Sequence, residues 1–119
     1  MAATAERIDF VGHRARNIAN QGGLSSELTV DFRVFRRGPA HVAGLIYTTD
    51  FWRTPHEALA AFQRFDGDFE VWQAKVTASG NNASFEYVIF CNDHRDVQNV
   101  RKIYNTNFGD TFRIVATVF

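Results

Sequence analysis

Aromatic and amide side chains lie together near the end of the chain. Residues 103–114 contain Tyr104, Asn105 and Asn107, with turn residues following them. An aromatic ring can cover the apolar C–H face of a pyranose, and side-chain amides can both donate to and accept from its hydroxyls. This combination predicts a shallow carbohydrate site, with Tyr104, Asn105 and Asn107 as its candidate residues.

A second stretch places a tryptophan beside a carboxylate. Residues 47–54 read Tyr-Thr-Thr-Asp-Phe-Trp-Arg-Thr, so Asp50 and Trp52 follow the end of a predicted strand. Binding residues collect in loops at the ends of sheets, which makes both residues candidates for the same kind of site. The alternative is that Trp52 closes one end of the core, because tryptophan is usually well buried.

The elements that would position these residues are predicted to be strands. Leu28, Val30, Phe32 and Val34 alternate with polar residues, and this pattern predicts a strand that buries them and leaves Phe35 on the opposite face. Further strands are predicted at 8–11, 42–47, 69–75, 85–91, 100–104 and 111–118. Short strands separated by turn signals are typical of an antiparallel β-sandwich, so the predicted fold class is all-β.

Two details of this pattern carry specific expectations. In the strand at 69–75, Phe69 and Val71 are predicted to point inward and Trp72 outward. At 54–57, Thr-Pro-His-Glu resembles a helix start, and Leu59, Phe62 and Phe65 follow at near-helical spacing. The sequence therefore predicts one short helix or turn near residues 55–64.

Length, charge and cysteine content limit the class of protein. The 119 residues predict a single domain, 1–119, and the 13 basic and 13 acidic residues leave no net charge to attract nucleic acid or anionic lipid. Neither a nucleic-acid partner nor membrane insertion is expected. The start of the chain has no apolar stretch of signal-peptide length, so a cytoplasmic or unconventionally secreted protein is expected. The single cysteine, Cys91, is predicted to be a buried thiol.

Residue types and spacings needed for catalysis or metal binding are not evident. His13, His41, His56 and His94 are scattered without ligand spacing, and no glycine-rich phosphate loop or Ser/His/Asp ordering stands out. We therefore expect no enzyme activity, no metal and no cofactor.

Four segments together resemble a known family. Residues 47–54, Asp68-Phe69-Glu70-Val71, residues 85–90 (Phe-Glu-Tyr-Val-Ile-Phe) and residues 104–112 (Tyr-Asn-Thr-Asn-Phe-Gly-Asp-Thr-Phe) resemble, in that order, the family 21 carbohydrate-binding modules. These are the starch-binding domains of some fungal glucoamylases and the glycogen-binding domains of protein phosphatase 1 targeting subunits. The resemblance covers about residues 28–115, and it implies an immunoglobulin-like β-sandwich that binds glucans by stacking.

The resemblance also assigns roles to individual residues. Trp52 matches the family's tryptophan after the second main strand, and Tyr104 matches the aromatic that opens its Asn-rich turn; in family members these form one sugar site. Asn105 and Asn107 fall at two polar positions of that turn, and Phe35 matches an aromatic of a possible second site.

The chain departs from the family pattern in the turn, where Asn105 replaces the usual Asp and Thr106 the first Asn, and at two further places. Val88 stands where starch-binding members can carry tyrosine, so one stacking surface is missing from the implied site. The phosphatase docking motif of a basic residue, valine, any residue and phenylalanine is not matched, because Arg33-Val34-Phe35 lacks the spacer. A phosphatase-targeting subunit is therefore not expected.

These observations predict a freestanding, lectin-like protein that binds a glucan or a glycoprotein glycan without catalysis. Single shallow sites bind weakly, so a homo-oligomer is expected, with Trp72, Phe108 and Phe119 as interface candidates. The alternative is a protein–protein interaction sandwich that uses the same exposed aromatics.

Overall fold

The described part of the chain is built entirely from strands. A computed structural model describes residues 7–20, 22–35, 42–93 and 101–117. Within these ranges there are nine strands and no helix, and so no helix that could span a membrane. This confirms the predicted all-β fold.

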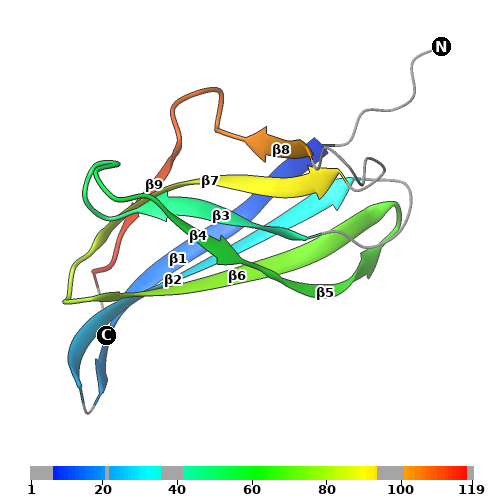
Figure 1. The fold of residues 1–119 in the computed structure, drawn as a ribbon. Coiled ribbons are helices and arrows are strands. Elements are labelled where there is room, and N and C mark those ends of the chain that lie inside the picture. The colour runs from blue at the N-terminus through cyan, green and yellow to red at the C-terminus, as the bar shows by residue number, and fades with distance from the viewer. Residues whose placement is uncertain (1–6, 21, 36–41, 94–100, 118–119) are drawn as a thin grey trace.

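The strands form two antiparallel sheets that face each other (Figure 1). Sheet A has four strands in the order β1 (Arg7–Asn20), β2 (Gly23–Phe35), β6 (Phe69–Ser79) and β5 (Ala61–Asp66). Sheet B has β4 (His56–Leu59), β3 (Ala43–Thr48), β7 (Ser84–Asp93) and β8 (Arg101–Asn105) in that order, and β9 (Phe112–Val115) also pairs with β7. One edge of β7 is therefore shared, by β9 along its first half and by β8 along its second half.

The hydrophobic core lies between the two sheets and follows the predicted alternation. Leu28, Val30, Phe32 and Val34 are all fully buried, as the pattern in β2 predicted. On the facing strand β7, alternate residues from Phe85 to Cys91 are also buried, which confirms the prediction of a buried thiol. A continuous core of this kind supplies most of the stability of a small sandwich.

The predicted orientation of β6 is wrong by one residue. Trp72 is 5% exposed and Glu70 is 3% exposed, and both face the core, whereas Phe69 and Val71 face outward and are only partly buried. The buried glutamate is compensated, because its Oε1 accepts a hydrogen bond of 3.0 Å from the indole nitrogen of Trp72. Trp72 is therefore a core residue and is not available as a surface interface.

The helix predicted near residues 55–64 is also wrong, because this segment forms β4 and β5. The chain leaves sheet B after Leu59 and enters sheet A at Ala61, and a bulge follows at Gln63. Each of these features shifts the two-residue alternation of a strand, and together they produce the three-residue spacing of Leu59, Phe62 and Phe65. Backbone pairing with β3 and β6 thus overrides the local helix signals.

Strand β4 approaches β3 so closely that one position must be glycine. A methyl group on Gly44 would overlap the backbone carbonyl oxygen of Ala58. Because this neighbour is backbone, the clash could be relieved only by moving β4 away from β3.

We expect Gly44→Ala to lower the free energy of unfolding by about 1–3 kcal/mol, the usual cost of overpacking. The matched control is Gly12→Ala, because a methyl group there meets no atom within 4 Å. Urea denaturation of both variants checks this. Equal stability of the two variants would show that β4 does not pack against β3 as described.

A histidine and a tyrosine are hydrogen-bonded across the sandwich. His13 Nδ1, in β1, and the hydroxyl of Tyr87, in β7, are 2.8 Å apart. The two rings belong to an aromatic cluster in which Phe112 stacks on Tyr87 and on Phe10, with ring centroids 5.3 and 4.7 Å apart. Burial lowers the pKa of His13 below its usual value of 6.5, and burial raises the pKa of Tyr87.

Protonation of His13 should therefore destabilise the fold. A histidine whose pKa is lowered by folding contributes its full stability above about pH 6.5 and loses it as the pH falls through the folded-state pKa. We expect the midpoint of urea unfolding to decrease between about pH 7.5 and pH 5.5, and this decrease to be smaller in His13→Asn. An identical decrease in both proteins would assign the pH dependence to other groups.

Candidate functional site

The loop between β3 and β4 is held by one buried hydroxyl. Thr48 Oγ1 donates to Asp50 Oδ1 at 2.6 Å and accepts from the backbone amides of Asp50 and Trp52, both at 3.1 Å. Asp50 Oδ1 also accepts from the amide of Thr54 at 3.0 Å. The hydrogen bonds from Thr48 and from the Thr54 amide hold the pKa of Asp50 below its usual range. The Asp50 carboxylate thus organises the loop.

This loop holds two aromatic residues in a strained backbone conformation. Phe51 and Trp52 have φ angles of 59° and 67°, in the left-handed region that bulky residues rarely adopt. Such positions cost about 1–3 kcal/mol each and are found mainly at functional sites. The conformation leaves the Phe51 ring 85% exposed, whereas Trp52 is partly buried. A loop that displays an aromatic ring at this cost is a candidate binding element.

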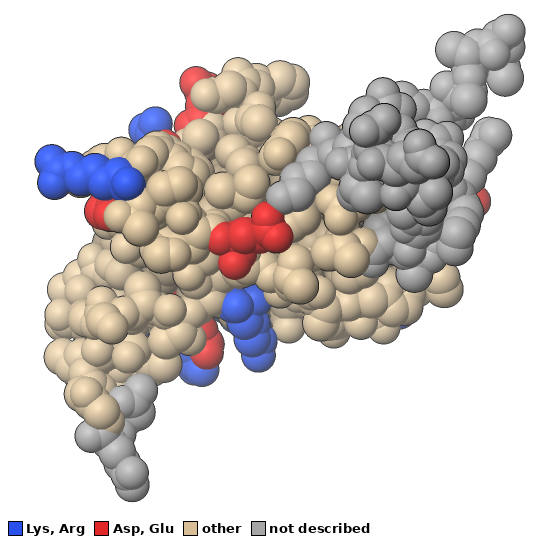
Figure 2. All heavy atoms as spheres, in the orientation of Figure 1, with Lys and Arg blue, Asp and Glu red and all other residues tan. Residues whose placement is uncertain are grey.

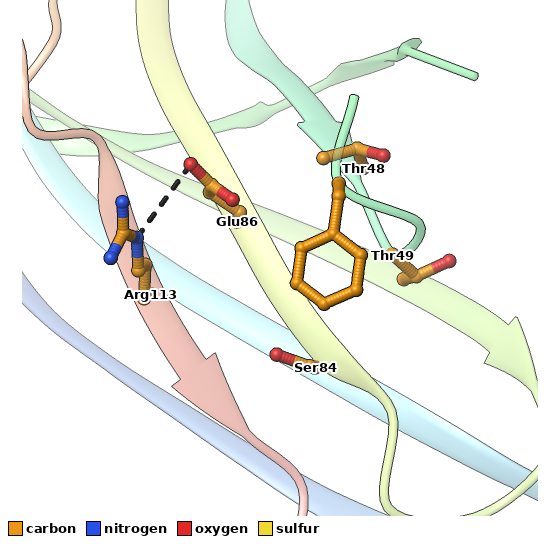
Figure 3. Close-up of a pocket in the computed structure, with 6 residues that line it drawn as sticks. Thr48, Thr49, Ser84, Glu86 and Arg113 are labelled. Carbon is orange, nitrogen blue, oxygen red and sulfur yellow. Dashed lines mark ion pairs between the residues drawn. The ribbon is translucent and has the colours of Figure 1, made fainter. Parts of the chain in front are cut away.

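Glu86, on the outer face of β7, connects this loop with the turn between β8 and β9. Its Oε2 accepts a hydrogen bond of 2.7 Å from Thr111 Oγ1 and lies 3.6 Å from Arg113 Nε. Figure 3 shows Glu86 and Arg113 pointing toward each other from neighbouring strands. Hydrogen bonds from the side chains of Thr111 and Trp52, together with the Arg113 charge, hold the pKa of Glu86 below its usual range. Glu86 is therefore a fixed carboxylate shared by three elements.

A shallow pocket of about 200 Å³ lies beside this carboxylate. It is lined by six residues, which we call the Glu86 pocket: Thr48, Thr49, Phe51, Ser84, Glu86 and Arg113. An exposed ring, hydroxyls, a carboxylate and a guanidinium group surround one hollow. These groups can stack on an apolar ring face and exchange hydrogen bonds with hydroxyls.

The predicted amide residues hold the turn between β8 and β9. Asn105 Nδ2 donates to the carbonyl of Ile8 at 2.8 Å, and its Oδ1 accepts from the amide of Asn107 at 3.0 Å. Asn107 has a φ of 55°, and its Nδ2 donates to the carbonyl of Thr111 at 2.9 Å. Each amide already makes a bond within the protein, so its first role in this structure is to shape the turn.

Tyr104, Asn105 and Asn107 line one groove, between this turn and β1. The Tyr104 side chain is 51% exposed and can act as a stacking surface. Asp50 and Trp52 do not line this groove. The structure therefore separates the predicted residues: three line this groove, whereas Asp50 and Trp52 belong to the loop beside the Glu86 pocket and line neither hollow.

Contacts across β7 connect the β3–β4 loop with the β8–β9 turn. The Trp52 side chain lowers the pKa of Glu86, Glu86 accepts a hydrogen bond from Thr111, and the carbonyl of Thr111 accepts one from Asn107. Tyr104 lies opposite Phe90, four residues along β7 from Glu86, which corresponds to about 13 Å of strand. The predicted residues therefore flank a single stretch of β7.

Phe35, the candidate for a second site, lines neither the Glu86 pocket nor the Tyr104 groove. It is on the outer face of sheet A, where its ring is 5.5 Å from the ring of Phe69 and 5.3 Å from the guanidinium carbon of Arg7. Arg33 also covers Phe69, at 4.2 Å. Phe35 is thus engaged in a cation–π cluster on the other sheet.

Sequence reasoning missed several residues of the Glu86 pocket. Phe51 is adjacent to Trp52 in a loop, and no pattern tells which of the two rings is exposed. Glu86 and Arg113 could have been paired from their outward positions on adjacent strands. Thr48 gave no signal, because its role depends on backbone amides that reach it only in the folded loop.

The described residues on the face drawn in Figure 2 show no concentration of charge of one sign. Among the described residues visible there, acidic and basic side chains are scattered and intermixed. This face therefore offers no extended surface of one sign to a highly charged partner.

Comparison with known proteins supports the fold. No family model matches the chain, and no curated protein matches it. Among solved structures, it is similar to the carbohydrate-binding module of the muscle glycogen-targeting subunit of protein phosphatase 1. The identity is 15%, the TM-score is 0.58, and the match covers 92% of this chain and 75% of the other. The chain thus has the β-sandwich fold that the family resemblance implied.

The Thr48 hydroxyl provides a test of the loop. Thr48→Val keeps the side-chain shape but removes the partner of two amides and of the Asp50 carboxylate. We expect a loss of about 1–3 kcal/mol in unfolding free energy and a change in tryptophan fluorescence. Thr49→Val, at an exposed neighbouring position, should change neither. If Thr48→Val matches this control, the hydroxyl does not hold the loop.

Proposed function

We propose that this protein is a non-catalytic carbohydrate-binding module. Its ligand, a glucan or a glycoprotein glycan, would lie on the outer face of sheet B between the β3–β4 loop and the β8–β9 turn. The observation that carries the proposal is the strained pair Phe51 and Trp52, which the buried Thr48 hydroxyl holds beside the Glu86 pocket. The likeness in fold to a carbohydrate-binding module supports the same conclusion.

In this arrangement the aromatic rings would bind the apolar faces of the sugars. Phe51 at one end and Tyr104 at the other are exposed enough to stack on a pyranose, and Trp52 presents the rest of its partly buried ring between them. Val88, part-exposed on β7, would lie under the middle of the glycan without stacking on it. The two aromatic ends favour a chain of several sugars over a single one.

Polar groups of the Glu86 pocket would then select hydroxyl positions. Glu86 is ionised, so it is an acceptor, and Arg113 remains largely exposed with guanidinium donors directed to solvent. Thr49 and Ser84 add exposed hydroxyls that both donate and accept. Because Glu86 already contacts Thr111 and Arg113, little side-chain ordering is required when a ligand binds.

A protein partner is the second candidate. Phe108, at the tip of the β8–β9 turn, is fully exposed, as expected for an anchor that enters a partner's pocket. Stacking on sugars and insertion into a protein make different demands. A sugar site needs the polar groups around Phe51, whereas a protein anchor needs only Phe108 and its apolar surroundings.

Three substitutions test the proposed site. We expect Phe51→Ala, Trp52→Ala and Tyr104→Ala each to weaken glycan binding by about 1–3 kcal/mol, through loss of apolar contact area. The measurement is isothermal titration with the best ligand of a panel that includes glycogen, amylose and glycoprotein glycans. Thermal melting should hardly change for Phe51→Ala and Tyr104→Ala, because both side chains are exposed.

The control is Leu24→Ala, a 45% exposed residue of β2 near the β1–β2 turn, which should bind normally. Normal binding by all three site variants would exclude this face. Absence of binding to every glycan, with loss of a protein partner in Phe108→Ala, would favour the second candidate.

A further inference from the structure

Strand β5 forms an edge of sheet A and is exposed along its whole length. All six residues from Ala61 to Asp66 are exposed, and within the described residues β5 pairs only with β6. An edge strand carries backbone N–H and C=O groups that can pair with another strand. Proteins commonly protect such edges, so the side chains of β5 decide what this edge does.

Two aromatic rings of β5 lie on its inner face. Phe62 is opposite the buried Trp72, and Phe65 is opposite the buried Glu70, because the bulge at Gln63 brings both rings to the same side. Phe62 contacts Trp72 at 5.7 Å between ring centroids, and Phe65 contacts Phe62 at 5.0 Å. The rings nevertheless remain 42% and 71% exposed. The core thus continues into an uncovered apolar surface at this edge.

Two opposite charges of β5 lie on its outer face. Arg64 is opposite Val71 and Asp66 is opposite Phe69, and both of these β6 residues face away from the core. β5 therefore carries a pair of rings on one side and a pair of opposite charges on the other.

We propose that β5 pairs with β5 of a second copy of this chain, in antiparallel orientation about a two-fold axis through Phe65. In this register Phe65 lies opposite Phe65 of the partner subunit, ring against ring on the inner face. On the outer face, Arg64 lies directly opposite Asp66 of the partner subunit, so opposite charges meet twice across the axis. The two copies of sheet A would become one continuous sheet.

The second copy is the occupant that this edge fits, because the strand is complementary to itself. A two-fold interface requires the same surface to serve as both partners, and in a single register β5 places the Phe65 rings on the axis and opposite charges face to face beside them. Shifting the pairing by one residue would place rings opposite charges on different faces. This inference does not rest on glycan binding, since β5 is separate from the Glu86 pocket and the Tyr104 groove.

Sedimentation velocity from micromolar to submillimolar concentration tests the proposal. The wild-type protein should show a concentration-dependent monomer–dimer equilibrium. Phe65→Arg should weaken dimerisation by about tenfold or more, as expected for loss of a central aromatic contact. Phe108→Arg, an equally drastic change at an exposed ring outside β5, should leave it unchanged. Circular dichroism confirms that each variant is folded.

A charge-swap experiment tests the register itself. Arg64→Asp and Asp66→Arg each place like charges across the proposed axis, so each variant alone should be more monomeric than the wild type. In an equimolar mixture, opposite charges meet again, and a heterodimer should form. Only intermolecular pairing of these two positions predicts this rescue.

A monomer at all concentrations would overturn the proposal. A dimer that persists in Phe65→Arg would also overturn it, because the interface would then lie elsewhere. A dimer weakened by Phe65→Arg, but with no rescue in the mixture, would contradict the proposed register. Loss of glycan binding in Phe65→Arg without any dimer would instead make β5 a ligand surface.

Discussion

The carboxylate of Glu86 is the point on which the candidate site depends. It projects from β7, accepts a hydrogen bond from Thr111 and pairs with Arg113, and the Trp52 side chain lowers its pKa; these three residues come from different elements. The β3–β4 loop and the β8–β9 turn could move without unfolding the core, because they lie at the surface. Their shared contact with one ionised group fixes the two binding loops relative to each other. The candidate site is therefore formed by sheet B together with both loops and does not depend on either loop alone.

Pre-organisation of this kind has a clear physical benefit for a shallow site. A ligand on an open surface gains little buried area, so any cost of ordering the protein would remove a large part of its affinity. The Thr48 hydroxyl and the Glu86 carboxylate order the loop and the turn when the protein folds, so this ordering is not required again when a ligand binds. Self-pairing through β5 would add a second benefit, because two weak sites on one particle can engage a polyvalent surface together. These two features lie on different sheets and can vary independently.

Sequence patterns predicted the orientation of strands in which apolar and polar residues alternate without a break. They failed where a contact formed only in the folded protein, such as a buried polar residue, interrupts this alternation. In β2 the pattern from Leu28 to Val34 was sufficient to predict which residues face the core, because every second residue is apolar. In β6 the inward residues include Glu70, whose burial is possible only because Trp72 binds it, so polarity indicated the wrong face. Trp52 and Tyr104 could be placed at strand ends by residue type. The exposure of Phe51 could not, because it depends on a left-handed backbone that Thr48 holds by hydrogen bonds formed only in the folded loop.

The central claim is that a glycan binds to the outer face of sheet B, and mapping of backbone amide chemical shifts during titration with a linear oligosaccharide tests it directly. The account predicts that the shifted amides concentrate in residues 48–54, 84–88 and 104–113, with the resonances of β5 and of Phe35 unchanged. Shifts confined to the outer face of sheet A, or none with any oligosaccharide of the panel, would contradict it.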